Sequence, residues 1–554
     1  MAVFKHWLLV VTVPAGLVAL LVLGGIAACR NGWLEPRGAG VTLAERDFTD
    51  GWRQVDLRGA PQMSRCSFAI PADAADAFTE MIVIENASSR QVRNFWFYRA
   101  DMPNFYSAQT IVDSVTAGAR TETDKVLALW ALFPRYYYNY DPISTGGMLL
   151  DPPTLFSVMG TAQCNYAAQT LSTLCELAGC KTRLLGITYE EGEPPIAHCV
   201  MEAYADGRWI YMDPDGHAVY RRADGEWASA EDLKADATPV ENTPHAYYPP
   251  KTLADAFRKG QVEYLERAEG EPSLADRERI PGLFHMFHHY MRFDLLPGER
   301  TEIFPMRNGA SYEMPLPIEA TGRLMWRYLP ENFAGGAPHG LLLENVSLSL
   351  KDGSLVLRRI EPLRPASLVV PMTSPFLMTG ARVVASVESP EPAQLSILPF
   401  ARGQLPSLEA WRPAGALTGD CSVVLDEFFS GQPLFGYALG ISVPEAGLRI
   451  QSLDVVTTLQ CAPEALPDLH DGANQFILYA QETPSAPPTA YSDAGVDGVQ
   501  FTNGLRIGFL PGKPDAIIAE RRSGTGLHDT ALQQAAAPDE SNPSPAALYS
   551  FAIR

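Results

Sequence analysis

One stretch of the chain, which begins near Cys164, constrains its fold more than any other. Apolar residues recur at helical spacing through residues 167–178, and Gly179 stands where a helix commonly ends. Thr161 is the predicted N-cap of this helix, which puts Cys164 in its first turn. A thiol in that place lies at the positive end of the helix dipole, beside backbone N–H groups that have no partner within the helix.

A β-hairpin is predicted soon after this helix. Residues 197–204 and 209–213 read as strands, and the Asp-Gly pair at residues 206–207 is a strong signal for a two-residue turn. This register makes His198 a diagonal neighbour of Asp213 on the same face of the hairpin. Diagonal neighbours lie about 7–8 Å apart at the backbone, which is close enough for a carboxylate to orient an imidazole.

Cys164, His198 and Asp213 are therefore the candidate catalytic residues. The helix dipole favours the thiolate form of a cysteine in the first turn, and the free N–H groups beside it suit an oxyanion hole. A cysteine paired with a histidine that a carboxylate holds in place is the arrangement used in covalent acyl transfer.

The segment from about 108 to 235 resembles a transglutaminase-like domain, a papain-related fold of bacterial, archaeal and eukaryotic proteins. The resemblance is carried by Cys164 with its helix and by residues 179–185, 198–202 and 206–214. It covers roughly a quarter of the chain.

This resemblance implies a role for each candidate residue. Cys164 would be the nucleophile, His198 the general base and acid, and Asp213 the residue that orients the imidazole. One position departs from the family pattern, because Ala162 stands where many relatives carry glycine two residues before the cysteine. The implied site contains no cofactor and no metal.

Other reactive or aromatic side chains are expected to be structural. Three cysteines are predicted to be core residues: Cys175, Cys180 and Cys199. His285, His288 and His289 have the spacing of one helix face, but the residues after them read as a strand, so no metal site is predicted there. The run of tyrosines at residues 135–140 is predicted to pack in the core, the alternative being an aromatic wall beside the substrate.

The N-terminus carries a candidate membrane anchor. An uncharged run from Trp7 to Ala28 is long enough to span a bilayer, which takes about 20 apolar residues. The residues that end at Cys29 also resemble a bacterial lipobox, in which Cys29 would be lipidated. A transmembrane helix and a lipoprotein signal both stay open. In either case the expected location is the cell envelope, with the body of the protein anchored to the membrane and periplasmic or extracellular.

The composition bounds the class of protein. A formal net charge of −21 argues against nucleic acid and anionic membrane surfaces as partners. The 45 prolines and 44 glycines favour many turns and β structure, and eight cysteines in 554 residues are too few for a disulfide framework.

The predicted fold class is α+β, with an N-terminal membrane anchor, a transglutaminase-like domain of cysteine-protease type and then all-β sandwich or jelly-roll domains. The predicted segments are an anchor or signal at 1–29, a tether at 30–50, a small β extension at 51–107, the transglutaminase-like domain at 108–235, a connector at 236–294, a β domain at 295–365, a jelly-roll-like sandwich at 366–482, and a linker with a partly disordered tail at 483–554. The sandwich pattern resembles the accessory sandwiches of extracellular carbohydrate-active proteins.

Two functions follow from these patterns. The first is a cysteine-dependent hydrolase or acyltransferase of the envelope, with a protein or peptide amide as substrate. The second is a non-catalytic protein that binds a cell-surface polysaccharide or assists assembly, in which Cys164, His198 and Asp213 are vestigial. The retained triad favours the first function, and the large β region, more than half of the chain, keeps the second open.

Overall fold

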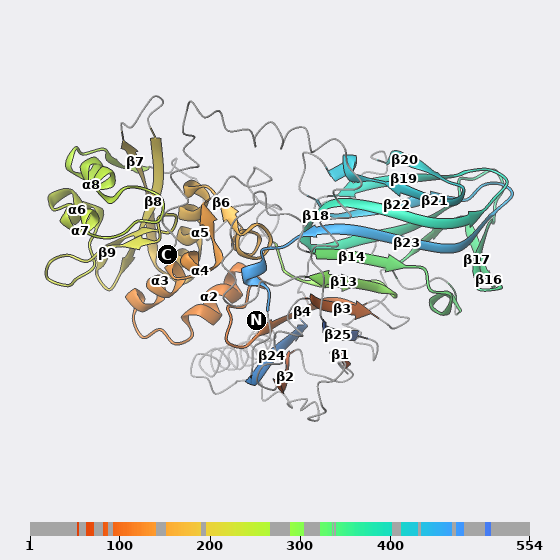
Figure 1. Cartoon of the computed structure of the whole chain (residues 1–554), viewed down its shortest axis with the longest axis horizontal. Helices are drawn as coiled ribbons and strands as arrows, with labels where there is room; N and C mark the ends of the chain where they lie inside the picture. Colours follow the sequence, from red (N-terminus) through yellow and green to blue (C-terminus); the bar gives the residue numbers. More distant parts are fainter. Residues whose placement is uncertain are drawn as a thin grey trace, which may run out of the picture.

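The structure of the protein is a computed structural model of the 554-residue chain. It describes residues 52–54, 63–70, 81–86, 92–139, 151–189, 196–265, 289–303, 322–334, 336, 340–400, 411–429, 434–467, 472–480 and 505–510. These residues form two lobes (Figure 1). One lobe combines helices with a small sheet, and the other is built from long strands. The α+β expectation is therefore confirmed as a mixed architecture whose C-terminal part is rich in strands.

The first lobe contains most of the helices. Its helices are α2 (Ala108–Thr116), α3 (Glu122–Trp130), α4 (Phe133–Tyr136), the π-helix η3 (Thr154–Met159), α5 (Cys164–Leu177), α6 (Ala230–Ala235), α7 (Thr238–Glu241) and α8 (Pro250–Arg258). Its strands are β5 (Tyr138–Asn139), β6 (Thr161–Ala162), β7 (Lys181–Tyr189), β8 (Ile196–Ala205), β9 (Arg208–Asp213), β10 (Ala218–Val219) and β11 (Val262–Leu265).

An antiparallel sheet with the strand order β10-β9-β8-β7-β11 separates two hydrophobic cores in this lobe. Side chains alternate along β8, so that Met201 and Ala203 belong to the core that α5 shares, whereas Val200 lies in the core under α6 to α8. Strands with helices on both faces are protected from water over most of their length. The hairpin of β8 and β9 is part of this sheet and lies between the two cores.

The predicted hairpin is confirmed in register and turn type. Tyr204 pairs with Trp209 and Ala205 with Arg208. The two turn residues, Asp206 and Gly207, both have positive φ, at 47° and 86°. This is the geometry of a type I′ turn, whose twist matches that of the flanking strands.

The predicted N-cap of α5 differs from the observed one. Thr161 lies in the short strand β6, and the residue at the N-cap of α5 is Gln163, which makes no side-chain capping hydrogen bond. The helix nevertheless begins at Cys164, as expected. The cause of the error is Gly160, whose left-handed φ of 66° ends η3 and leaves Thr161 free to pair with β5.

The second lobe and the sheets beside it consist of strands. They are β1 (Trp52–Gln54), β2 (Met63–Ile70), β3 (Met81–Asn86), β4 (Val92–Arg99), β12 (Phe293–Leu295), β13 (Glu299–Ile303), β14 (Gly322–Arg327), β15 (Leu342–Glu344), β16 (Val346–Lys351), β17 (Ser354–Arg359), β18 (Ser367–Glu388), β19 (Ala393–Phe400), β20 (Arg412–Leu417), β21 (Gly419–Val424), β22 (Leu434–Ser442), β23 (Leu448–Gln460), β24 (Gly472–Ala480) and β25 (Leu505–Leu510), with the short 3-10 helices η4 (Pro330–Phe333), η6 (Asp426–Phe429) and η7 (Pro463–Ala465).

Strand pairing joins segments that are far apart in the sequence. β3 lies between β13 and β25 in one sheet, and β24 lies between β2 and β4 in another. The long strands β18 and β23 form the centre of the large sheet, and β23 also pairs with β14. The boundaries predicted at 107, 365 and 482 therefore separate strands that are neighbours in these sheets. The division of the chain into these domains stays a prediction.

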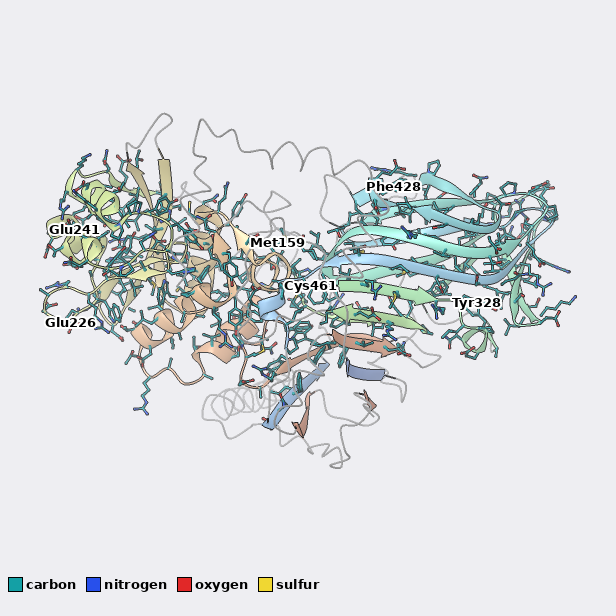
Figure 2. The ribbon with its side chains drawn as sticks, viewed as in Figure 1. Met159, Glu226, Glu241, Tyr328, Phe428 and Cys461 are labelled. Carbon is teal, nitrogen blue, oxygen red and sulfur yellow. The ribbon has the colours of Figure 1, made fainter. Side chains whose placement is uncertain are left out.

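The π-helix η3 connects the two lobes, and all six of its residues are buried. The amide of Ala462 donates to the carbonyl of Ser157 (2.9 Å), and Gln460 Nε2 lies 3.6 Å from Met159 Sδ. Figure 2 shows Met159 and Cys461 together at this junction. Because the contact is buried on both sides, the position of the first lobe depends on the strands of the second.

Within the described part of the chain, no helix combines the length and the apolar character that crossing a membrane requires. The anchor predicted at residues 1–29 lies outside the described residues, as do His285 and His288.

Candidate active site

Cys164 is the first residue of α5, and its side chain is partly exposed. The amides of Cys164 and Asn165 lie in the first turn, where no carbonyl of the helix can accept from them. Because Gln163 makes no capping hydrogen bond to these amides, they stay available to a ligand on the thiol side of the helix. In α2, α3 and α6, by contrast, the side chain of the N-cap residue accepts a hydrogen bond from an amide of the first turn.

The structure brings His198 and Asp213 into direct contact. Nε2 of His198 lies 2.7 Å from Oδ2 of Asp213, and both side chains are buried. The other ring nitrogen, Nδ1, faces the opposite way. One ring nitrogen of His198, Sγ of Cys164 and a carboxylate oxygen of Asp215 lie within 4.8 Å of one another. The three residues singled out in the sequence thus meet at one place, and their catalytic roles stay a prediction.

Asp213 is held by three hydrogen-bond donors. Besides His198, Nε2 of His245 lies 2.9 Å from Oδ2, and the amide of Gly216 donates to Oδ1 at 2.6 Å. The indole N–H of Trp130 donates to the backbone carbonyl of Asp213 at 3.2 Å. A carboxylate that accepts several hydrogen bonds is strongly favoured in its ionised form. Asp213 is therefore a fixed negative charge behind His198.

The tautomer of His245 follows from its backbone neighbours. Its Nδ1 accepts hydrogen bonds from the amides of Tyr248 (3.0 Å) and Tyr247 (3.3 Å), so the ring proton lies on Nε2 and is donated to Asp213. The ring packs closely on Gly216, where an added Cβ would come within 1.8 Å of Nε2. Only glycine therefore fits at position 216 beside this imidazole.

Asp215 is a second buried carboxyl group in the site. Oδ2 of Asp215 lies 3.8 Å from Nδ1 of His198, on the side of the ring that faces Cys164. The hydroxyl of Tyr137 lies 2.7 Å from Oδ1, and Nδ2 of Asn139 donates to Oδ2 at 3.2 Å. The hydroxyl of Tyr137 also lies 2.7 Å from the carbonyl oxygen of Ala162. These contacts tie β5 and β6 to the site.

The surroundings shift the pKa of each of these groups. Burial by itself lowers the pKa of His198, but the charge and hydrogen bond of Asp213, with smaller effects of Cys164 and Asp215, raise it to about 10. Burial raises the pKa of Asp213, yet His198 and His245 outweigh this effect and hold it well below its ordinary range. The imidazole and the carboxylate are therefore both charged near neutral pH.

Asp215 behaves differently from Asp213. Burial raises its pKa to about 6, and the negative charge of Asp213 adds to the rise, while His198 and the hydrogen bond from Tyr137 oppose it. Asp213 and Asp215 thus lie on either side of the His198 ring. The surroundings lower the pKa of Asp213 and raise the pKa of Asp215.

The cysteines predicted to be structural divide into two groups. Cys175 and Cys180 are buried, and burial raises the pKa of both. Cys199 is partly exposed, and burial together with the charge of the nearby Cys164 raises its pKa to about 12. Cys164, Cys175, Cys180 and Cys199 form no disulfide bond.

Sequence reasoning missed Asp215, His245, Tyr137 and Asn139. Asp215 had a local signal, because it follows Asp213 by two residues across Pro214. His245 had none, because it lies 32 residues after its partner and no spacing rule links them. The tyrosine run was expected to pack, and Tyr137 is indeed fully buried, but its hydroxyl lies in the site.

Comparison with known families agrees with this geometry. The family model of the transglutaminase-like superfamily matches residues 109–214, a range that includes Cys164, His198 and Asp213. The chain therefore contains a transglutaminase-like domain, and the superfamily consists typically of cysteine-dependent enzymes. The resemblance predicted from the sequence is confirmed for this segment.

Similar solved structures are more distant. A variant of a family 29 carbohydrate-binding module is 15% identical (TM-score 0.17), and the match covers 26% of this chain and 91% of that module. A low-affinity xylan-binding module from Roseburia intestinalis is 12% identical (TM-score 0.16; 24% and 96% covered). A putative protease from Parabacteroides distasonis is 9% identical (TM-score 0.17; 72% of each chain). Likenesses this low carry no argument about this chain. No curated protein matches it.

Proposed function

We propose that the protein is a cysteine-dependent hydrolase or acyltransferase that acts on amide bonds of proteins or peptides. The observation that supports this function best is the position of His198, which has Asp213 at 2.7 Å on one ring nitrogen and Cys164 on the side of the other. A nucleophile, a base and an orienting carboxylate in this order are the groups that covalent acyl transfer uses.

In the first half of the reaction, Sγ of Cys164 attacks the carbonyl carbon of the amide, and its proton is held on Nδ1 of His198. The amides of Cys164 and Asn165 donate to the oxyanion that forms. Nδ1–H of His198 then protonates the leaving amine as the carbon–nitrogen bond breaks, which leaves a thioester on Cys164. Asp213 keeps the second ring proton on Nε2 throughout, so that Nδ1 is the nitrogen that exchanges protons.

In the second half, His198 Nδ1 takes a proton from the molecule that attacks the thioester. Water gives a carboxylic acid, and an amine gives a new amide; the proton returns to the thiol of Cys164 in both cases. Both acceptors require the same proton transfer by His198, so the proposal includes both hydrolysis and transfer.

Trapping the acyl-enzyme tests this function. The full-length protein is incubated with peptide mixtures, and mass spectrometry is used to look for an acyl group on Cys164. We expect a thioester that hydroxylamine removes and that is missing in Cys164→Ala but kept in Cys421→Ala, whose cysteine is partly exposed in the second lobe. Iodoacetamide should also label Cys164 faster than Cys421. Equal labelling rates together with no acyl adduct would contradict the proposal.

We further propose that residues 1–29 hold the protein at a membrane, with the body outside the cytoplasm. The support is the uncharged run from Trp7 to Ala28 and the candidate lipidation residue Cys29. Reporter fusions after Gly40 decide the side, since activity of a cytoplasmic reporter alone would contradict it. Palmitate labelling that disappears in Cys29→Ser would choose a lipid anchor over a spanning helix.

A cell-surface polysaccharide is a proposed second partner, for the strand-rich lobe. Trp326 does not serve this purpose, because its indole is buried and donates to the carbonyl of Pro297. Trp411 is partly exposed over Gly440 and is the aromatic residue to test. We expect Trp411→Ala to weaken co-sedimentation of the full chain with envelope polysaccharides; retention equal to that of the parent protein would exclude this residue.

A further inference from the structure

Three different metal-binding atoms meet at the start of α5. Sγ of Cys164, a ring nitrogen of His198 and a carboxylate oxygen of Asp215 lie within 4.8 Å of one another. We propose that these three residues form a binding site for a zinc ion, and that zinc held there blocks the thiol reversibly. The sequence predicted no metal site, because Asp215 was not recognised as a neighbour of Cys164.

His198 is prepared as a metal ligand by its surroundings. Its Nδ1 is buried and has no hydrogen-bond partner among the described residues. Its Nε2 is held by the carboxylate of Asp213 at 2.7 Å. A histidine that binds a metal almost always donates its other ring N–H to a carboxylate or carbonyl, which fixes the ring and makes the free nitrogen a better donor. His198 and Asp213 have this relation.

The distance between His198 and Asp215 suits a tetrahedral ion. Nδ1 and Oδ2 are 3.8 Å apart. In a tetrahedral zinc site, with bonds of about 2.0–2.1 Å to nitrogen and 2.0–2.2 Å to oxygen, these two atoms would be about 3.4 Å apart. A small rotation of the Asp215 carboxyl group closes the difference. The hydroxyl of Tyr137 contacts Oδ1 of that group and the side-chain amide of Asn139 contacts Oδ2, as the supporting residues of a metal site do.

The kinds of ligand select zinc over the hard cations. A thiolate and an imidazole are poor ligands for Mg²⁺ and Ca²⁺, which prefer oxygen, whereas zinc binds sulfur, nitrogen and carboxylate oxygen together. Zinc displaces the proton on Nδ1 of His198 when it binds, and the resulting neutral imidazole, together with a thiolate and a carboxylate, balances the double charge of the ion. Since only three protein atoms bind it and Cys164 is partly exposed, the fourth position is left to water.

The neighbouring group of His198, Asp213 and His245 also lies within 4.8 Å, but it is a hydrogen-bonded network. Both Nε2 atoms already donate to Asp213, and Nδ1 of His245 accepts from the amides of Tyr247 and Tyr248. A metal bound there would have to displace the protons on both Nε2 atoms, and none of the atoms it would bind lacks a hydrogen-bond partner. This group therefore supports the zinc site from outside.

Zinc in this place would occupy the thiolate electron pair and the nitrogen that takes the proton. The inference rests on the proposed function only for this effect on activity, because binding itself requires nothing but the three side chains. Binding is measured first, on the full-length protein freed of metal with a chelator. We expect one zinc ion per chain by equilibrium dialysis, and protection of Cys164 from iodoacetamide that is reversed by the chelator. Mg²⁺ at the same concentration should give no protection.

Cobalt(II) reports on the ligand atoms directly. A thiolate-to-cobalt absorption band in the near ultraviolet should be present in the parent protein, absent in Cys164→Ser and unchanged in Cys421→Ser. Asp215→Asn should weaken zinc binding at least about 10-fold, in the range found when groups of a metal site are altered. Asp224→Asn, which changes an exposed carboxylate that pairs with Arg222, is the matched control.

Each outcome is decisive for this site. If zinc leaves the iodoacetamide rate of Cys164 unchanged in the parent protein, the inference is wrong, whether or not a variant folds. Zinc binding of undiminished strength in a folded Asp215→Asn protein would remove Asp215 from the site and overturn the three-ligand proposal. A protein that binds zinc at Cys164 but forms no acyl-enzyme would retain this site and contradict the proposed function; the reverse result would do the opposite.

Discussion

At the scale of single residues, Asp213 is the group that keeps the imidazole of His198 charged. It is buried, ionised and bonded to His198, His245 and the amide of Gly216. The structure shows that its loss leaves two buried imidazoles without their acceptor, so a cost in stability is expected as well.

The first prediction concerns Asp213→Asn. An asparagine amide can donate to Nε2 of His198, which would place the ring proton on Nδ1 and remove the base from the side of Cys164. We expect acyl transfer to fall by about 10⁴-fold, as the wrong tautomer does in a serine-protease triad. The rate of thioester formation measures it, with Asp224→Asn as the control on the surface. A rate within a few-fold of the parent would contradict the orienting role.

The second prediction concerns His245, which no sequence pattern revealed. His245→Ala removes a donor to Asp213 and leaves the amides of Tyr247 and Tyr248 without their acceptor. We expect the free energy of unfolding to fall by about 1–3 kcal/mol, the usual effect of losing a hydrogen bond to a buried charge. Urea unfolding measures it. His245→Gln, which keeps a donor, should recover part of the loss; equal stability of His245→Ala and the parent would show that the contact is unimportant.

The third prediction is a pH dependence of stability. The pKa of His198 rises from its ordinary 6.5 to about 10 on folding, so its contribution is complete below about pH 6.5 and is lost as the pH rises to about 10. The difference in unfolding free energy between the parent and His198→Gln should therefore decrease over this interval. Urea titrations at both ends measure it. A difference that is constant, or that increases with pH, would contradict the charged pair with Asp213.

At the scale of elements, the turn between β8 and β9 fixes the hairpin against α3. The carboxylate of Asp206 accepts from the amides of Glu122 and Thr123, and the amide of Asp206 donates to the side chain of Glu122. This contact caps α3 from outside, in addition to the capping box of Thr121 and Asp124. Thr121 is the N-cap of α3, because its side chain accepts from the amide of Asp124.

The fourth prediction tests this turn. Gly207 has φ of 86°, and an added Cβ would meet no atom within 4 Å, so Gly207→Ala introduces backbone strain without a clash. We expect a loss of about 1–2 kcal/mol in the free energy of unfolding. Gly118→Ala, also in open space, is the control and should cost nothing comparable. If both substitutions have the same effect, the left-handed turn is not under strain.

At the scale of the whole molecule, the two lobes share one hydrophobic core. The core around α5 continues through the buried helix η3 to β18 and β23. His289 also connects the two lobes. Its amide donates to Asp151 in the first lobe, and its Nε2 lies 2.6 Å from the carbonyl oxygen of Pro375 in the second. The strands of the second lobe therefore cover one face of the helical lobe.

The fifth prediction follows from this shared core. A chain that ends after residue 265 would expose η3 and leave β4 without β12 and β24. We expect its transglutaminase-like domain to melt more than about 5 °C below that of the full chain, because the loss of even a few kcal/mol of packing has an effect of this size. Calorimetry of both proteins measures it. An unchanged melting temperature would show that the lobe is independent.

Features formed by residues close together in the sequence could be predicted, whereas contacts between distant residues could not. The helix at Cys164, the type I′ turn and the register that brings His198 beside Asp213 all arise from residues within one local stretch. Helical periodicity, a turn signal and strand alternation are local properties, so the sequence is enough to predict them. The strand-rich character of the second lobe was predicted for the same reason.

The tertiary structure alone decided which distant groups join these elements. His245 reaches Asp213, and Asp215 comes to face Cys164, because β5, β6 and the segment before α8 fold around the end of the hairpin. In the same way, β3 pairs with β25 although the two strands are far apart in the sequence. Such contacts depend on how complete elements pack, and burial is what shifts the pKa values of the two carboxyl groups in opposite directions. The sequence by itself pointed to Cys164, His198 and Asp213 as the proposed nucleophile, base and orienting carboxylate. Tertiary packing decided the charges of His198 and Asp213, the residues that support them and the third ligand of the proposed zinc site.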